Sequence, residues 1–214
     1  MKKNLFIVFE GIDGSGKSTQ VKLLGKKLEE QGIKVYTTFE PTTSRIGTII
    51  KDIFKHKMEA DHRTIAALYV ADRLHHLLNK TDGILKKLED GYTVICDRYN
   101  FSSYAYQSAH VDPEWVIEAN SLSADLLRPD LNIYIDISPE VGMKRIDKGR
   151  DAAELYESTE NLYLVQKRYF EAFKKLGDKE KIVIIDGNRS ENLIANDVLN
   201  EVLKIAELQK LQDT

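Results

Sequence analysis

Near its start the chain reads Phe9-Glu10-Gly11-Ile12-Asp13-Gly14-Ser15-Gly16-Lys17-Ser18-Thr19-Gln20. Its glycines, lysine and serine fit the pattern G-x-x-x-x-G-K-[ST] of a phosphate-binding loop. An apolar run over 5–9 precedes the loop, and apolar residues at helical spacing follow it. This order of strand, loop and helix predicts that backbone N–H groups and the helix N-terminus hold phosphate oxygens. Lys17 would reach the β- and γ-phosphates of a nucleotide, and the Ser18 hydroxyl would hold Mg²⁺.

The composition predicts one ordinary globular domain over 1–214, since 42% of the residues are hydrophobic and 30% are charged. The net charge of -3 argues against nucleic-acid or membrane-surface binding, which usually needs a basic face. Cys96 is the single cysteine, so an internal disulfide is impossible. The apolar part of the N-terminal segment is too short for a signal peptide. We therefore expect a cytoplasmic protein.

Apolar runs alternate with helical patterns along the chain, which predicts an α/β fold with a parallel sheet covered on both faces. We expect five strands, at 4–10, 34–39, 92–97, 131–137 and 181–186. We expect helices at 17–32, 44–56, 60–90, 112–127, 138–148, 153–177 and 190–211. Ligands in such sheets bind beyond the carboxyl ends of the strands. The phosphate loop, Glu40 and Asp97 all lie at those ends, so we expect the site there.

Asp97 and Arg98 end the third predicted strand. An aspartate there, beside a phosphate loop, is placed to hold Mg²⁺ directly or through water. The planar guanidinium of Arg98 suits a phosphate dianion. The alternative is a structural ion pair at the strand terminus.

Two further groups have an ordinary and a functional interpretation. Asp72 and Arg73 either lie on the solvated face of a helix or share a face with Tyr69, where an aromatic ring and an arginine could bind a base. The basic residues after the fourth strand form either an ordinary charged helix or a mobile lid, at about 143–157, that closes over a triphosphate. These residues are Lys144, Arg145, Lys148 and Arg150.

Several motifs occur in an order that resembles the thymidylate kinase family, from about residue 4 to 187. They are Glu10–Thr19, Phe39-Glu40-Pro41, Ala71-Asp72-Arg73, Asp97-Arg98-Tyr99 with Ser102-Ser103-Tyr104-Ala105-Tyr106-Gln107, Arg128-Pro129-Asp130-Leu131 and Ser138-Pro139-Glu140-Val141-Gly142. The phosphate loop is common to many enzymes, whereas the stretch from Asp97 to Gln107 and the sequence R-P-D-L are much more specific. The resemblance implies a three-layer P-loop kinase fold, ATP-dependent phosphorylation of dTMP to dTDP with Mg²⁺, and a homodimer.

The resemblance also implies roles for individual residues. Lys17, Arg98 and Asp13 would act in catalysis, with Asp13 beside the deoxyribose 3′-hydroxyl and Arg98 on the dTMP phosphate. Tyr69 would pack on thymine, Arg73 would donate to a thymine carbonyl, and Arg145 would pack on adenine. ATP would contact Gly11, Ile12, Asp13, Gly14, Ser15, Gly16, Lys17, Ser18, Thr19 and Arg145, with Mg²⁺ at Ser18 and Asp97. The acceptor would contact Asp13, Phe39, Glu40, Pro41, Tyr69, Asp72, Arg73, Arg98, Ser102, Ser103, Tyr106 and Gln107.

The chain departs from the family pattern in two places. Thr42 and Thr43 follow Pro41 where bacterial relatives often have two glycines. Leu155-Tyr156-Glu157 lacks the arginine that relatives carry just before the final glutamate. The catalytic cation would then come from Arg150, Lys148 or Arg145, and we expect Arg150.

Two other functions are compatible with the phosphate loop. A deoxynucleoside kinase would use Glu40 as the base that removes a hydroxyl proton. A regulatory ATPase would need a partner surface and a residue that positions water, and the sequence shows no convincing candidate for either. The stretch from Asp97 to Gln107 favours a monophosphate acceptor.

Overall fold

The computed structural model describes residues 4–149, 155, 156 and 158–212. Its strands are β1 (Phe6–Glu10), β2 (Val35–Phe39), β3 (Thr93–Asp97), β4 (Leu131–Asp136) and β5 (Ile182–Asp186). They form one parallel sheet in the order β2-β3-β1-β4-β5. The five-stranded parallel sheet predicted from the sequence is confirmed, with bounds that differ by one or two residues.

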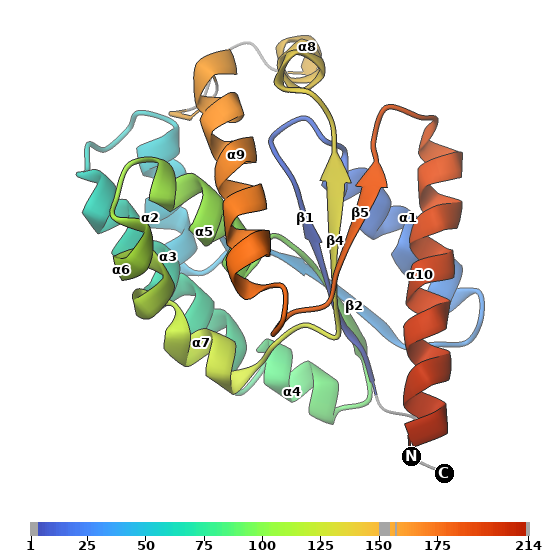
Figure 1. The fold of residues 1–214 in the computed structure, drawn as a ribbon. Coiled ribbons are helices and arrows are strands. Elements are labelled where there is room, and N and C mark those ends of the chain that lie inside the picture. Colours follow the sequence, from blue (N-terminus) through green and yellow to red (C-terminus); the bar gives the residue numbers. More distant parts are fainter. Residues whose placement is uncertain (1–3, 150–154, 157, 213–214) are drawn as a thin grey trace.

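Helices cover both faces of the sheet (Figure 1). They are α1 (Lys17–Glu29), α2 (Arg45–Phe54), α3 (His62–Leu78), α4 (Ile84–Glu89), α5 (Asn100–Tyr106), α6 (Pro113–Ala119), α7 (Ser121–Leu126), α8 (Pro139–Gly149), α9 (Thr159–Leu176) and α10 (Glu191–Gln212). Side chains of β1 alternate between the faces because the strand has a period of two residues. Ile7 and Phe9 pack with α1 and α10, whereas Phe6 and Val8 pack with α3 and α4. This is the three-layer P-loop kinase fold.

Several helix bounds differ from the prediction. The pattern over 60–90 forms two helices, because the Asn79 side chain accepts hydrogen bonds from the backbone N–H groups of Thr81 and Asp82 and turns the chain. The pattern over 112–127 breaks at Asn120 between α6 and α7. The sequence analysis missed α5, which directly follows β3. The start expected for 153–177 falls partly outside the described residues, and α9 begins at Thr159.

Local residue types explain several of the helix ends. Asp112 caps α6 by accepting from the backbone N–H of Trp115, and Pro113 occupies the first turn. Gly91 follows α4 with a φ of 90°, and its N–H donates to the Leu88 carbonyl. Within the described part of the chain, no helix is long and apolar enough to cross a membrane.

Candidate active site

The phosphate loop joins β1 to α1 at the carboxyl edge of the sheet. Gly14 has a φ of 76°, and a Cβ atom there would lie 2.4 Å from the Gly142 carbonyl oxygen, so only glycine fits. Gly16 precedes α1 with a φ of 94° and gives that helix no side-chain cap. The first N–H groups of α1 are therefore free to bind an anion.

Lys17 is buried within this loop. Its ammonium group donates to the Ile12 carbonyl at 2.9 Å and to the Ser15 hydroxyl at 3.3 Å. Burial and the nearby Arg98 charge lower the pKa of Lys17 to about 8, although Asp97, Asp13 and Glu10 oppose this shift. An additional negative charge in the loop would stabilise the protonated form.

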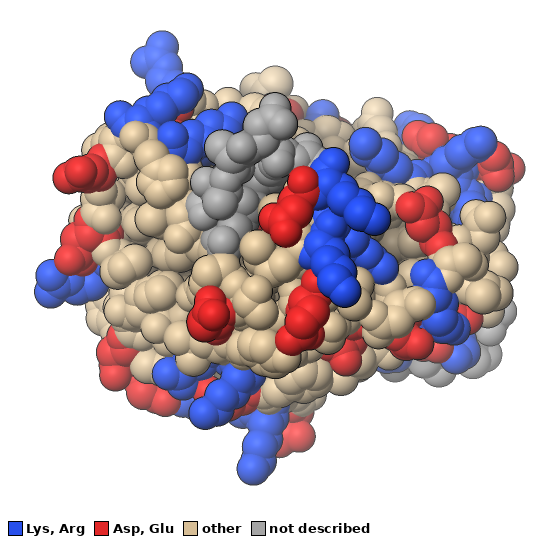
Figure 2. All heavy atoms as spheres, turned by 90° about the horizontal axis from the view of Figure 1, so that it is seen from above, with Lys and Arg blue, Asp and Glu red and all other residues tan. Residues whose placement is uncertain are grey.

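A cavity of about 710 Å³ lies in front of the phosphate loop. Its lining includes Asp13, Gly14, Ser15, Gly16, Lys17, Ser18, Thr19, Asp97, Arg98, Arg145, Gly187 and Arg189. Gly11 and Ile12 do not line it. Arg145 comes from α8 and donates to the carbonyl oxygens of Gly14 at 3.2 Å and Gly187 at 3.1 Å. Figure 2 views this face of the molecule, and lysine and arginine side chains gather near its middle with acidic side chains beside them.

Ser18 and Asp97 offer a cation site in the same cavity. The Ser18 hydroxyl donates to Asp97 Oδ2. Asp97 Oδ1 is buried and has no hydrogen-bond partner among the residues that the structure describes. Hydroxyl and carboxylate oxygens are hard ligands, and Mg²⁺ is usually held by one or two carboxylates together with water and phosphate. These two residues therefore fit Mg²⁺.

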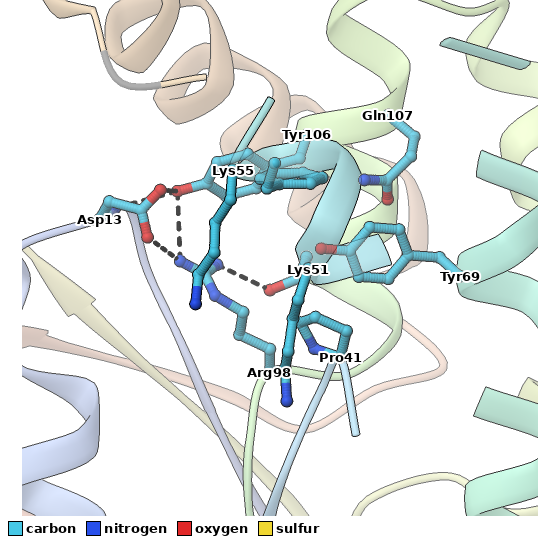
Figure 3. A pocket seen from close by; sticks show the side chains of 10 residues that line it. Asp13, Pro41, Lys51, Lys55, Tyr69, Arg98, Tyr106 and Gln107 are labelled. Atoms are coloured by element: carbon cyan, nitrogen blue, oxygen red, sulfur yellow. Dashed lines mark hydrogen bonds and ion pairs between the residues drawn. The ribbon is translucent and has the colours of Figure 1, made fainter. Parts of the chain in front are cut away.

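A second cavity, of about 310 Å³, lies between α2, α3 and α5 (Figure 3). It is lined by Asp13, Pro41, Lys51, Phe54, Lys55, Tyr69, Arg98, Ser102, Tyr106 and Gln107. The rings of Tyr69 and Phe54 meet edge to face, with their centroids 6.3 Å apart. The amide oxygen of Gln107 is buried and lacks a hydrogen-bond partner in the described part of the chain. This cavity thus combines an aromatic surface with a hydrogen-bond acceptor, the Gln107 amide oxygen, that has no donor among the described residues.

Arg98 and Asp13 form the wall between the two cavities, since both residues line both of them. The Arg98 guanidinium pairs with Asp13 and donates to the Ser102 hydroxyl at 3.1 Å. Tyr106 donates to the Asp13 carboxylate at 3.0 Å and receives the Asp13 backbone N–H at 2.9 Å. Burial alone would raise the pKa of Asp13, but the Arg98 and Lys17 charges outweigh it and lower that pKa.

Arg98 has a left-handed backbone, with a φ of 73°, which is unusual for a residue other than glycine. Its backbone N–H donates to the Phe9 carbonyl at 2.9 Å, which ties it to β1. Glu10 supports the next residues, because its buried carboxylate accepts from the backbone of Tyr99 at 3.0 Å and from the Ser102 hydroxyl at 2.6 Å. Glu10 was not among the predicted site residues, although its place before the first loop glycine could have suggested a role.

Five of the residues expected to contact the acceptor do not line the second cavity: Phe39, Glu40, Asp72, Arg73 and Ser103. Arg73 is fully buried and donates to Glu40, Ser103, Asn120 and the Tyr99 carbonyl. Glu40 also contacts His76, at 3.1 Å.

Asp72 is buried as well. It accepts from the backbone N–H of Thr42 at 2.7 Å and from the Ser44 hydroxyl at 2.8 Å. Phe39 is 45% exposed and lies beside another groove. Glu40, Asp72, Arg73 and Ser103 are thus buried in hydrogen bonds with other residues of the protein and are not exposed in the second cavity.

The structure also adds residues that the sequence analysis missed. Lys51, Phe54 and Lys55 of the α2 region line the second cavity. Their spacing places them on one side of the helix predicted over 44–56. The sequence did not indicate that this side of the helix would face the site. In the segment 143–157, which was expected to form either a lid or an ordinary charged helix, Lys144, Arg145 and Lys148 lie on α8, whereas Arg150 is outside the described residues. The Leu155 backbone N–H donates to the Phe54 carbonyl at 3.3 Å, so this residue contacts the end of α2.

Comparison with known proteins identifies the family. A family model described as thymidylate kinase matches residues 9–198. The thymidylate kinase of Shouchella clausii is 37% identical over 209 residues, which cover 94% of this chain and 96% of that protein. The probable thymidylate kinase of Methanocaldococcus jannaschii is 38% identical over 95% of this chain and 96% of its own length. That of Staphylothermus marinus is 40% identical over 93% and 94%. The chain therefore belongs to the thymidylate kinase family, whose members phosphorylate dTMP to dTDP with ATP.

Proposed function

We propose that this chain transfers the γ-phosphoryl group of ATP to dTMP and releases ADP and dTDP, with each substrate in one of the two cavities. The observation that carries the proposal is the shared wall, because Asp13 and Arg98 line both cavities. A donor phosphate in the first cavity and an acceptor phosphate in the second would meet at that wall.

The reaction needs charge neutralisation more than base catalysis. An oxygen of the dTMP phosphate attacks the γ-phosphorus, and the bond to the β-bridging oxygen of ATP breaks. The acceptor phosphate is anionic near neutral pH, so no strong base has to remove a proton. Lys17 would hold the donor phosphates and Arg98 would grip the acceptor phosphate, which brings two anions together. Asp13 would orient Arg98 and bind the 3′-hydroxyl of the sugar.

Magnesium would be held by Ser18 and Asp97, and when bound it neutralises charge on the donor phosphates. Arg145 would pack against adenine. The catalytic cation expected at Arg150 stays a prediction, which the loss of turnover in an Arg150→Ala variant would test. The homodimer and the cytoplasmic location also stay predictions, to be tested by sedimentation and cell fractionation.

Thymine would lie against Tyr69 and Phe54, with Gln107 as its polar partner. The buried, unsatisfied amide oxygen of Gln107 supports this placement, because it could accept the ring N–H of the base. To donate a hydrogen bond to a thymine carbonyl, Arg73 would have to break one of the hydrogen bonds that it makes in this structure. Uracil lacks one methyl group, worth about 1–3 kcal/mol, so dUMP should react at about 10–200-fold lower kcat/KM than dTMP.

The deoxynucleoside kinase alternative requires Glu40 as a base. Glu40 is instead buried in contact with Arg73 and His76 and does not line the acceptor cavity. The deciding experiment incubates the protein with ATP and either dTMP or thymidine, and measures the nucleotides formed. We expect dTDP from dTMP and no dTMP from thymidine. Phosphorylation of thymidine alone would reject the proposal, and ATP hydrolysis unaffected by either compound would favour a regulatory ATPase.

A further inference from the structure

Two lysines of the α2 region, Lys51 and Lys55, lie one helical turn apart and line the acceptor cavity together with Arg98 (Figure 3). Among the lining residues that the structure describes, Asp13 is the one carboxylate, and it is already paired with Arg98. The described part of the lining therefore holds three cations and one anion. Such an excess of positive charge favours a negatively charged ligand.

The two lysines differ in what they contact. The Lys51 ammonium donates to the Thr42 carbonyl at 2.9 Å and lies 4.8 Å from the centre of the Phe39 ring. The Lys55 ammonium has no hydrogen bond or ion pair with any residue that the structure describes, and Figure 3 shows its side chain reaching toward the Asp13–Arg98 pair. Burial lowers the pKa of Lys51, and the Lys55 charge adds to this shift while Asp72 opposes it. The two ammonium groups therefore repel each other.

An ordinary role for Lys55 would be to cap the end of α2, where a cation is favoured by the helix dipole. The last carbonyls of that helix, however, already accept backbone N–H groups. The Ile53 carbonyl accepts from His56 at 3.0 Å, and the Phe54 carbonyl accepts from Leu155 at 3.3 Å. Capping of α2 therefore does not explain why the Lys55 side chain points into the cavity.

We propose that Lys55 binds the phosphate of the acceptor nucleotide from the α2 side of the cavity, so that this phosphate is held between Lys55 and Arg98. The inference rests on the proposed function only in taking the second cavity as the acceptor site. Two cations would neutralise a phosphate dianion better than one and would reduce its repulsion of the incoming γ-phosphate. Lys51 acts as a positioning residue, which holds the segment after Pro41 through the Thr42 carbonyl.

The test compares a ligand that carries the phosphate with one that lacks it. Calorimetry without ATP would measure the binding of dTMP and of thymidine to the wild-type protein and to Lys55→Ala. We expect dTMP affinity to fall about tenfold or more in the variant, the usual effect of losing a charged hydrogen bond, and thymidine affinity to change by less than about twofold. Lys55→Arg should keep most of the preference for dTMP.

Lys57→Ala is the matched control, because Lys57 is an exposed lysine two residues away that pairs with Asp52 and does not line the cavity. It should leave both affinities unchanged. An equal loss of dTMP and thymidine binding in Lys55→Ala, or no loss of either, would overturn the assignment. So would a wild-type protein that binds thymidine as tightly as dTMP.

Thermal unfolding separates this role from a structural one. Lys55→Ala should melt at the same temperature as the wild type or slightly above it, because its repulsion of Lys51 is removed. A clear drop in melting temperature would instead mean that Lys55 supports the fold. Wild-type turnover of dTMP is measured separately. A protein that prefers dTMP through Lys55 but forms no dTDP would refute the proposed function and leave this inference standing.

Discussion

Arg98 is the residue on which the two cavities converge. Its left-handed backbone, its pairing with Asp13 and its hydrogen bond to Ser102 hold the guanidinium in the wall between them. We expect Arg98→Ala to lose at least about 100-fold in kcat/KM, equivalent to about 2.7 kcal/mol, because the acceptor phosphate loses its clamp. Steady-state kinetics with dTMP would measure this loss. Arg63→Ala, which removes an exposed arginine paired with Asp61, is the control, and near wild-type activity of Arg98→Ala would exclude the clamp.

We expect Lys17 to make ATP binding sensitive to alkaline pH. Its pKa in the free protein is lowered to about 8, whereas the unperturbed value is about 10.4. Above pH 8 the free protein loses the proton that a bound triphosphate needs, so ATP affinity should fall, by up to about tenfold per pH unit. Titrations of ATP binding between pH 7 and 9.5 would follow this decrease. An affinity that stays constant over that range would show that Lys17 remains protonated.

At the scale of elements, the buried Arg73–Glu40 pair fastens α3 to the end of β2. Arg73 also reaches α5 and the end of α6 through Ser103 and Asn120. Replacing Arg73 with methionine would leave the Glu40 carboxylate buried without its main cation. We expect a loss of about 3–5 kcal/mol in the free energy of unfolding, measured by urea denaturation. A loss below about 1 kcal/mol would mean that His76 alone compensates the Glu40 charge.

Across the whole molecule, the two cavities and the elements between them should be stabilised together by substrates. A ligand present at 100 times its dissociation constant adds about 2.7 kcal/mol to the free energy of unfolding. For a chain of this size that corresponds to about 5–10 °C in melting temperature. We expect dTMP to produce such a shift by itself, and a larger one together with ADP. Thermal melts at matched concentrations should show a much smaller dTMP shift for Arg98→Ala, and an equal shift would contradict the proposed placement of the phosphate.

Most of the fold could be predicted because its signals are local. The apolar runs and the glycines of the phosphate loop act through residues close in sequence, and both appear in the structure as expected. The errors occur where a side chain overrides helical periodicity. Asn79 accepts two backbone N–H groups and ends a helix whose apolar pattern continues beyond it. The helix α5 was missed because its residues carry the binding motif and show no clear apolar period.

The site was predicted less completely than the fold. A sequence indicates which residues lie at the carboxyl ends of the strands, as it did for Asp13 and Arg98. The family resemblance added Tyr106 and Gln107, and all four residues line one cavity. It did not indicate that Glu40 and Arg73 would neutralise each other behind that cavity, because the partners are 33 positions apart in the chain.

Local spacing thus specified the sheet, the phosphate loop and the residues that reach the functional edge, since these depend on backbone conformation and on the period of the apolar residues. Packing between distant elements decided the rest. Whether a charged side chain meets a buried partner, as Arg73 does, or an open cavity, as Lys55 does, depends on which neighbour occupies the space in front of it. The tertiary arrangement of α2, α3 and α5 determines that neighbour, and the sequence around either residue does not indicate it.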